Sequence, residues 1–531
     1  MPPLVSPLSP PTPAYRPKLQ ATGSSSGGLD DEYGEMDRSD KIFEAGALTL
    51  ESGLIVPNTR VAYRTWGALN EARDNVVFIS HALTGNAAVD SWWGVLLGEG
   101  RAFDSSKYFI VCANMLGSCY GTTGPNDPLP DPPPSWVAPR AGTHRAAAGA
   151  RYAADFPYCT VRDTVSLHYK LLVDHLQVNS LHAVIGGSAG GMQALEWAIM
   201  YPSFVRRVVA MACGATQSPW QIGISESQRQ AIYRDPNWND GFYHNDSPPS
   251  DGLANARQQA MVWYRSQQAY DKKFGRQEQP ASPGGVAERA NLSSGGGPSR
   301  ESSAHNGGAN VTTTDVSDGS WGFEGGGAPP TYAVEAYLEH QGVKFLERFD
   351  ANTYIALTKL IDSHDVGRDR GGVDKALATV ACPVLVIGLA SDVLYPIEMQ
   401  KELADKLPRG CLRIVQSIQG HDGFLLEGGR IGAMVTGALE AEEGADMESS
   451  LLSDSGINAG TSSLNTSEDE ATVEESDHDR TLRETLALPS SMTDMNKALA
   501  EFRSGNAGKK KSSGGGAMRL LTPAQEWFYG I

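Results

Sequence analysis

Three residues spread over the chain have the side chains that nucleophilic acyl chemistry needs. Ser188 lies in the run Val-Ile-Gly-Gly-Ser-Ala-Gly-Gly at 184–191, which has the G-x-S-x-G spacing of a serine on a sharp strand-to-helix turn. A serine hydroxyl is a weak nucleophile, so it needs a histidine base and a carboxylate that orients the base. Asp392 and His421 follow in the order Ser, Asp, His, and this order predicts a catalytic triad on a nucleophile turn.

Short apolar runs predict the elements that position these residues. Residues 181–185 predict a buried strand, 192–200 a helix that ends before a proline, and 204–212 the next strand, which together make a βαβ crossover. Residues 383–389 predict the strand before Asp392, and 412–415 the strand before the glycine-flanked loop of His421. The alternatives are an ordinary glycine-rich turn at Ser188, a helix cap at Asp392 and a structural role for His421.

Acyl transfer also requires backbone N–H donors for the oxyanion of the tetrahedral intermediate. The amide of Ala189, directly after the nucleophile, is the first predicted donor. The second should come from the loop that follows an early strand, and residues 76–86 supply such a strand and loop. His81 in this loop is predicted to be structural, because it precedes the nucleophile and lies on the oxyanion side.

The chain resembles the homoserine O-acetyltransferase family of the α/β-hydrolase fold. The matching segments occur in family order between about residues 45 and 435, and they are 81–85 (HALTG), 114–125 (NMLGSCYGTTGP), 186–197, 348–354 (RFDANTY), 391–396 (SDVLYP) and 420–425 (GHDGFL). The resemblance implies an α/β fold with a mostly parallel sheet flanked by helices, an inserted helical cap and disordered tails. It also implies the triad Ser188, Asp392 and His421, with Leu83 and Ala189 as the oxyanion donors.

The resemblance implies an amino-acid acceptor as well. Family members bind it through an arginine in an R-Q-A-I segment and through the aspartate after the catalytic histidine, which here are Arg229 and Asp422. A guanidinium can hold the acceptor carboxylate and an aspartate its ammonium group. For Arg229 the alternative is a solvated helix arginine, and for Asp422 a loop residue that accepts from nearby amides. Acetyl-CoA is the implied co-substrate, with no permanently bound cofactor.

Several functions remain open from the sequence. L-homoserine is the leading acceptor, but L-serine differs by one methylene, which a pocket discriminates by only ~1–3 kcal/mol. A serine esterase or hydrolase is a second alternative, which Arg229 and Asp422 oppose, and a binding protein without catalysis is a third. The family usually has methionine where this chain has Ala189, so acyl-chain selectivity and exclusion of water are in question.

By composition, the 531 residues fall into a catalytic part and additional polar segments. We expect a core at 41–215 and 379–440, and a helical cap at 216–378 that excludes water from the acyl-enzyme. Polar, glycine-rich or acidic sequence predicts disorder at 1–40, in an insertion at about 277–330, and at 441–517. The aromatic end at 518–531 is expected to dock on the core.

The net charge of −18 argues against nucleic acid or an anionic membrane as a partner. No apolar run approaches the ~20 residues of a membrane helix, and no targeting segment is evident at the start of the chain, so a cytoplasmic location is expected. The six cysteines lack metal-ligand spacing, so no metal site is expected. The resemblance implies a homodimer built through the cap helices, which the sequence itself does not decide.

Overall fold

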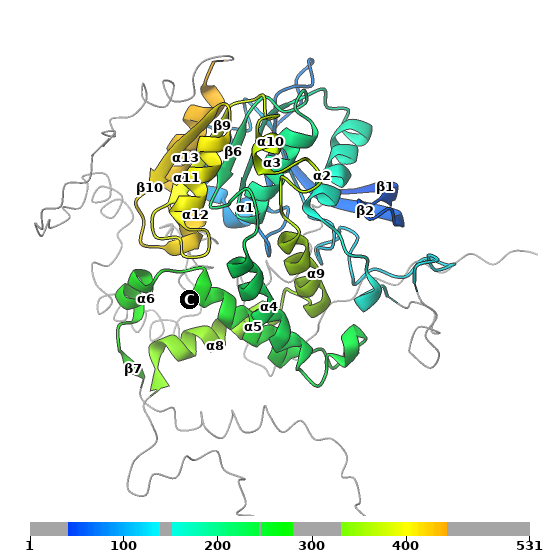
Figure 1. Cartoon of the computed structure of the whole chain (residues 1–531), viewed down its shortest axis with the longest axis vertical. Helices are drawn as coiled ribbons and strands as arrows, with labels where there is room; N and C mark the ends of the chain where they lie inside the picture. The colour runs from blue at the N-terminus through cyan, green and yellow to red at the C-terminus, as the bar shows by residue number, and fades with distance from the viewer. Residues whose placement is uncertain (1–40, 138–150, 244–245, 280–330, 443–531) are drawn as a thin grey trace, which may run out of the picture. The chain divides into compact units, whose positions relative to one another are not determined.

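The computed structural model describes residues 41–137, 151–243, 246–279 and 331–442 (Figure 1). The predicted arm at 1–40, the predicted segments at 441–517 and 518–531, and the insertion at 277–330 lie outside these residues, apart from 277–279 and 441–442. None of the described helices is long and apolar enough to cross a membrane.

The centre of the molecule is an eight-stranded sheet with the order β1-β2-β4-β3-β5-β6-β9-β10. The first three strands in this order pair antiparallel and all later neighbours pair parallel, which confirms the mostly parallel sheet. The strands are β1 (Lys41–Thr49), β2 (Ile55–Trp66), β3 (Val76–Ser80), β4 (Phe109–Ala113), β5 (Leu181–Gly187), β6 (Val208–Met211), β9 (Val384–Leu389) and β10 (Gly410–Val415).

The central strands are buried on both faces, which explains their unbroken apolar sequences. In β3, Phe78 packs in one hydrophobic cluster while its neighbours Val77 and Ile79 pack in the other. This alternation follows from side chains that point to opposite faces of a strand. The strand predicted at 204–212 begins later, at Val208, because the backbone around Phe204 first forms a turn and meets the chain at Leu181.

Helices cover both faces of the sheet. Residues of α2, α3 and α11 belong to the cluster that contains Phe78, and residues of α13 belong to the opposite cluster. Shorter helices complete the two layers. The helices of this part are α1 (Val89–Trp92), α2 (Val161–Lys170), α3 (Ala189–Met200), α10 (Val373–Leu377), α11 (Ile397–Lys406), α12 (Gly423–Leu426) and α13 (Gly428–Glu440).

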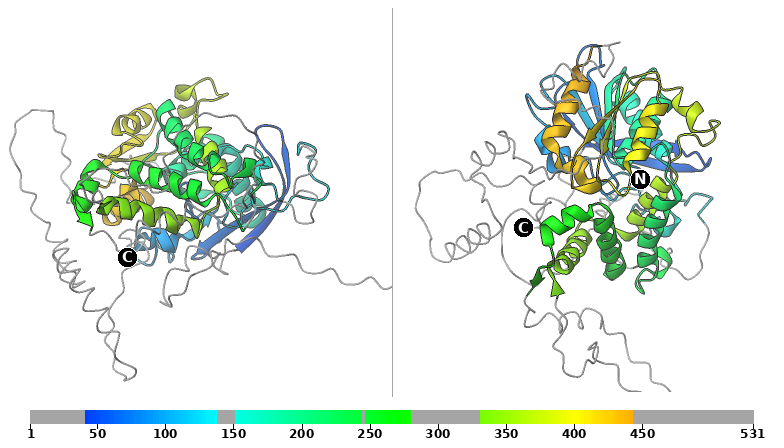
Figure 2. Two further views of the ribbon diagram at one scale, coloured as in Figure 1. Left: turned by 90° about the horizontal axis from the view of Figure 1, so that it is seen from below. Right: turned by 60° about the vertical axis from the view of Figure 1, so that its left-hand side comes forward.

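A second group of helices lies in the chain between β6 and β9, and Figures 1 and 2 show it gathered beside one end of the sheet. α4 packs against α5 and α9, and α5 packs against α8. Polar residues start these helices: the Asp350 side chain accepts from the amide of Thr353, and Ser266 accepts from that of Ala269. The helices are α4 (Pro219–Tyr233), α5 (Ser250–Trp263), α6 (Gln267–Phe274), α8 (Ala333–Leu346) and α9 (Ala351–Asp362).

A small hairpin joins α6 to α8. Its strands, β7 (Glu278–Gln279) and β8 (Thr331–Tyr332), pair antiparallel. The described chain therefore stops at residue 279 and resumes at residue 331 in a neighbouring position.

Candidate active site

Ser188 occupies the turn between β5 and α3, as predicted from its spacing. Its φ of 56° and ψ of −125° lie in a region that residues with a side chain rarely adopt, which costs about 1–3 kcal/mol. The backbone holds it there, because the Ser188 amide donates to the Met211 carbonyl (2.9 Å) and its carbonyl accepts from the Met192 amide (3.1 Å). Such strain, imposed by surrounding hydrogen bonds, is typical of a nucleophile turn.

The glycines around Ser188 are required by space. A Cβ on Gly186 would lie 2.4 Å from the backbone of Gly190, and a Cβ on Gly190 would lie 2.0 Å from the Ser80 carbonyl oxygen. Neither contact can be relieved by moving a flexible side chain. Strand β5, helix α3 and the end of β3 can therefore meet at Ser188 only because these positions lack side chains.

Asp392 and His421 form a buried pair at the ends of the neighbouring strands β9 and β10. The Nδ1 atom of His421 lies 2.8 Å from Oδ2 of Asp392. The other carboxylate oxygen accepts from the amides of Leu394 (2.8 Å) and Tyr395 (2.9 Å), so the carboxylate is fixed in place. This geometry leaves Nε2 of His421 as the nitrogen available for proton transfer.

The surroundings of His421 set its basicity. Burial alone lowers the pKa of this histidine, but the charge and hydrogen bond of Asp392, and then the charge of Asp422, raise it, and the net direction is upward. The rings of Tyr264, Tyr395 and Phe424 pack around the imidazole with centroids 5.3–5.9 Å away. His421 is therefore held in one orientation and is a stronger base than an ordinary histidine.

Leu83 and Ala189 lie on two segments that one glutamine ties together. The Nε2 atom of Gln193 is 3.2 Å from the Ala189 carbonyl and 3.3 Å from the His81 carbonyl. From the other side, Arg348 donates to the carbonyl of Thr84 (2.9 Å), next to Leu83. The loop after β3 is thus fixed relative to the start of α3, as a pair of oxyanion donors requires.

His81 has the structural role that its position predicted. Its Nδ1 lies 2.8 Å from the Ala82 carbonyl, and its Nε2 accepts from the Met115 amide (3.0 Å). Burial lowers its pKa to about 4. Since both nitrogens are engaged by backbone, His81 is not a rival base.

The comparisons with known proteins give a general fold and a set of named relatives. The alpha/beta hydrolase fold family matches residues 75–295. The homoserine O-acetyltransferase of Chlorobium chlorochromatii (strain CaD3) is 40% identical over 393 residues, which are 74% of this chain and 93% of the relative. That of Saccharomyces cerevisiae (strain ATCC 204508 / S288c) is 39% identical over 73% of this chain and 83% of the relative. The chain belongs to the homoserine O-acetyltransferase family.

Solved structures with the same fold include both transferases and esterases. Homoserine O-acetyltransferase from Bacillus anthracis matches with a TM-score of 0.61 and 23% identity, over 76% of this chain and 98% of that chain. Esterase E22 matches with a TM-score of 0.59 and 22% identity, over 76% and 99%. At these identities the likeness establishes the α/β-hydrolase fold and nothing finer.

In this member of the homoserine O-acetyltransferase family, the helices between β6 and β9 contact the loop that carries His421. The amide of Asp422 donates to the carbonyl of Tyr264 (2.9 Å), just after α5. Asp422 is buried, and burial raises its pKa, while the charges of Arg265, His421 and Arg257 oppose that rise. The Asp422 carboxylate thus lies next to His421 and near the end of α5.

Arg229 lies in a different environment from His421 and Asp422. Its guanidinium pairs with Asp362 (Nη2 to Oδ2, 2.7 Å) and with Glu226 (Nε to Oε2, 2.9 Å), and the residue is only 1% exposed. Two carboxylates of the protein already balance its charge. Its remaining nitrogen, Nη1, is buried without a hydrogen-bond partner in the described part of the chain, so the role of Arg229 in binding the acceptor carboxylate stays a prediction.

A different arginine, Arg257 on α5, has the contacts expected of an anion site. It is 3% exposed, and its guanidinium lies 5.0 Å from the ring centroid of Phe345 and 5.8 Å from that of Tyr264. No hydrogen bond or ion pair joins it to another residue of the described ranges. Burial, and then the Arg348 cation, lowers its pKa, while Asp422 opposes that change. Among the described residues, no carboxylate pairs directly with this buried cation, and Asp422 acts on it only from a distance.

Sequence reasoning missed Arg257, although one signal was present. Arg257 stands within the buried stripe Leu253, Ala256, Ala260 and Met261 of α5, where a charge needs a reason. Arg229 lies on a comparable stripe of α4, and its partner Asp362 is more than a hundred residues away in sequence. The stripe alone therefore could not separate the two arginines.

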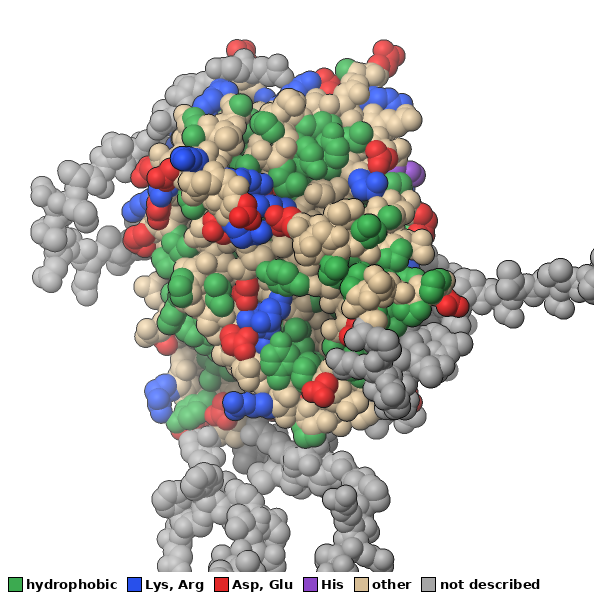
Figure 3. All heavy atoms as spheres, turned by 45° about the vertical axis from the view of Figure 1, so that its right-hand side comes forward, with side chains coloured by type: hydrophobic (Ala, Val, Ile, Leu, Met, Phe, Trp, Pro, Cys, Tyr) green, Lys and Arg blue, Asp and Glu red, His purple; other side chains and the backbone are tan. Residues whose placement is uncertain are grey.

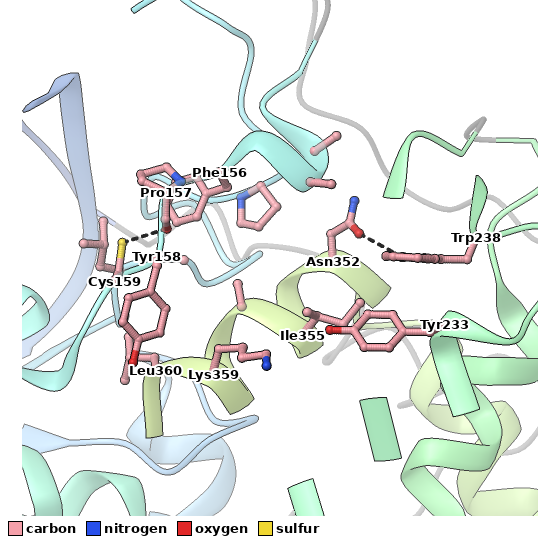
Figure 4. A pocket seen from close by; sticks show the side chains of 16 residues that line it. Phe156, Pro157, Tyr158, Cys159, Tyr233, Trp238, Asn352, Ile355, Lys359 and Leu360 are labelled. Atoms are coloured by element: carbon pink, nitrogen blue, oxygen red, sulfur yellow. Dashed lines mark hydrogen bonds between the residues drawn. The ribbon is translucent and has the colours of Figure 1, made fainter. Parts of the chain in front are cut away.

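A cavity of about 510 Å³ lies beside α9, lined by residues of this helix and of the segment before α2 (Figure 4). Aromatic side chains line it, among them Tyr158, Tyr233 and Trp238, with Lys359 as a cation and Asn352 bonded to the Trp238 ring nitrogen (3.3 Å). None of the predicted site residues borders this cavity.

Proposed function

We propose that this chain transfers the acetyl group of acetyl-CoA to the hydroxyl of L-homoserine through an acetyl-serine intermediate. Relatives that carry this activity in their names are about 40% identical over most of their length. The observation that carries the proposal is the juxtaposition of a buried Asp-His pair with an unbalanced cation and a carboxylate, Arg257 and Asp422. A plain esterase has no need for the second pair.

In the first half of the reaction, His421 takes the proton of Ser188 as the hydroxyl oxygen attacks the thioester carbonyl. The amides of Leu83 and Ala189 hold the oxyanion, and Asp392 stabilises the imidazolium. His421 then gives the proton to the leaving thiolate of CoA, which leaves acetyl-Ser188. In the second half, His421 takes the proton of the acceptor hydroxyl as its oxygen attacks the acetyl carbonyl. His421 then gives this proton to Ser188 Oγ as the ester bond to the serine breaks.

The acceptor is an amino-acid zwitterion, and we propose that Arg257 binds its carboxylate while Asp422 binds its ammonium. Two fixed charges of opposite sign orient the molecule, so that its hydroxyl reaches the acetyl carbon with little loss of entropy at the reaction step. Arg229 remains the alternative for the carboxylate, through its buried Nη1, which has no hydrogen-bond partner among the described residues.

The helices at 216–378 are proposed to act as the cap that excludes water from acetyl-Ser188. Ala189 in place of the usual methionine leaves less side chain beside the acetyl group, so some hydrolysis is expected along with transfer. We also propose a homodimer and a cytoplasmic location, in line with a biosynthetic enzyme that uses acetyl-CoA.

The test is release of free CoA from acetyl-CoA with L-homoserine, L-serine or water as acceptor, by the wild type and by Ser188→Ala. Release that prefers homoserine and is absent from the variant supports the proposal. A preference for serine moves the chain to the serine acetyltransferase activity with the same mechanism. Release that is indifferent to both amino acids overturns the transferase function and leaves a hydrolase.

A further inference from the structure

The loop after β3, at residues 81–88 (the oxyanion loop), is fixed to the core at both ends. At its start, the Met115 amide donates to Nε2 of His81 (3.0 Å). Near its end, the Ala87 amide donates to Oδ1 of Asn114, a buried side chain (2.7 Å). The position of the residues between these two attachments depends on a further contact.

The middle of the oxyanion loop is a tight turn. The Gly85 amide donates to the Ala82 carbonyl (2.9 Å), which closes the turn around two central residues, Leu83 and Thr84. The Thr84 carbonyl accepts from Nη1 of Arg348 (2.9 Å). This bond fixes the peptide group after Thr84, and with it the turn that carries the Leu83 amide.

A second loop of the core fixes the guanidinium of Arg348. The same Nη1 donates to the hydroxyl of Tyr120 (2.9 Å), whose backbone carbonyl accepts from Nδ2 of Asn114 (2.6 Å). On the face in Figure 3, Lys and Arg side chains lie beside Asp and Glu side chains, as in the ion pairs of a solvated surface. The two oxygens that Arg348 bonds here are uncharged, so these bonds act through their geometry.

Arg348 reaches the oxyanion loop from the cap. It lies between α8, which ends at Leu346, and α9, which begins at Ala351. The ring of Phe345, on α8, is stacked with two cations, because its centroid lies 4.9 Å from the guanidinium carbon of Arg348 and 5.0 Å from that of Arg257. A movement of these helices away from the core therefore breaks the bond to the oxyanion loop.

We propose that Arg348 is a positioning residue that couples the cap to the oxyanion hole. By holding the Thr84 carbonyl, it keeps the turn of Leu83 in the orientation that an oxyanion donor needs, so the hole is complete only while the cap lies in place. Donors of this kind stabilise a transition state only when they are preorganised, and a displacement of about 1 Å can cost 10²-fold in rate. The inference rests on the proposed acetyl-serine mechanism.

The test compares Arg348→Met with Arg73→Met. Arg73 is also half-buried and donates to a backbone carbonyl, that of Leu176 (3.2 Å), but it lies just before β3, away from the oxyanion loop. In Arg348→Met, kcat should fall roughly 10–100-fold both for acetyl transfer and for hydrolysis of p-nitrophenyl acetate, while the KM for homoserine stays within twofold. Arg73→Met should behave as wild type.

Two further variants separate positioning from folding. Arg348→Lys keeps a donor that can reach one of the two oxygens, so it should recover part of the rate. Tyr120→Phe removes the second acceptor and leaves Arg348 in place, so kcat should fall only a few-fold, in the same direction for both reactions. Thermal unfolding of each variant shows whether a loss of rate is due to a loss of folded protein.

Inhibition by methylboronic acid reports on the oxyanion hole directly. Ser188 Oγ bonds the boron, His421 takes the serine proton, and the tetrahedral adduct places an oxygen where the oxyanion forms. Its inhibition constant should rise in Arg348→Met by about the factor by which kcat falls.

An unaltered inhibition constant in Arg348→Met, or a rise in the KM for homoserine without a fall in kcat, would overturn the inference. The outcome is independent of the acceptor. If the wild type hydrolyses p-nitrophenyl acetate but acetylates no homoserine, the proposed function fails, while the hydrolysis rates and inhibition constants still decide the role of Arg348.

Discussion

The candidate active site has two walls: a core wall, formed at the ends of the sheet strands, and a cap wall, formed by the helices between β6 and β9. The two walls are built differently. On the core wall, backbone hydrogen bonds fix Ser188 and Asp392, and Asp392 fixes His421. On the cap wall, Arg257 is surrounded by aromatic rings and makes no such bonds within the described ranges. Under the proposed function, the core wall performs the chemistry, which does not depend on the acceptor, and the cap wall selects the acceptor.

The largest effect is expected from breaking the core wall at Asp392→Asn. Asparagine can still accept from the amides of Leu394 and Tyr395 but cannot stabilise an imidazolium, so kcat should fall about 10⁴-fold. Acetyl transfer to homoserine and hydrolysis of p-nitrophenyl acetate should fall together, in a steady-state assay of both. Asp374→Asn, at an exposed carboxylate, is the control. Loss of transfer alone would contradict the division between the walls.

Breaking the cap wall at Arg257→Met should separate the two reactions. Loss of a buried bidentate contact to the acceptor carboxylate should lower kcat/KM for homoserine about 100-fold, a cost of ~2.7 kcal/mol. Hydrolysis of p-nitrophenyl acetate, which has no carboxylate, should change by no more than a few-fold. An equal fall in both rates would show that Arg257 supports the fold and not the acceptor.

Arg229→Met sharpens the contrast, because this arginine is as buried as Arg257 but is balanced by protein carboxylates. Its removal leaves Asp362 without its partner, so the free energy of unfolding should fall by ~3 kcal/mol in urea titrations. The KM for homoserine should stay within twofold of wild type. Stability should return when Asp362→Leu is added. A large rise in KM with unchanged stability would assign the acceptor carboxylate to Arg229 after all.

The smallest effect concerns pH and two buried histidines. The pKa of His421 is raised above its ordinary 6.5, so kcat/KM should rise with pH through an apparent pKa above 6.5 as the imidazole loses its proton. The pKa of His81 is lowered to about 4, so its neutral form contributes stability that is present above pH 6.5 and is lost as pH falls toward 4. Urea midpoints across pH 4–9 should therefore fall on both sides of pH 6.5: below it as His81 gains a proton, and above it as His421 loses one. A midpoint that stays constant below pH 6.5, or a rate that does not rise above it, would contradict these roles.

Sequence was sufficient for the features that depend on local pattern. The glycines around Ser188, the order of Asp392 and His421, and the apolar strands before them each reflect short-range geometry, and the structure has these strands and turns. The start of β6 at Val208 was missed because apolar residues also fill the turn before it. The contrast between Arg229 and Arg257 depends on which acids approach from distant helices, and no local pattern carries that information.

The hairpin of β7 and β8 has a consequence for how this protein could change over time. Gln279 and Thr331 are paired, so the chain between them begins and ends at neighbouring points. Lengthening such a segment adds only the logarithmic cost of closing a longer loop, about 0.6 kcal/mol for each doubling. This position can therefore gain or lose sequence while α6 and α8 keep their places. Natural variation in length, and the attachment of engineered sequences, should be tolerated there before anywhere else in the cap.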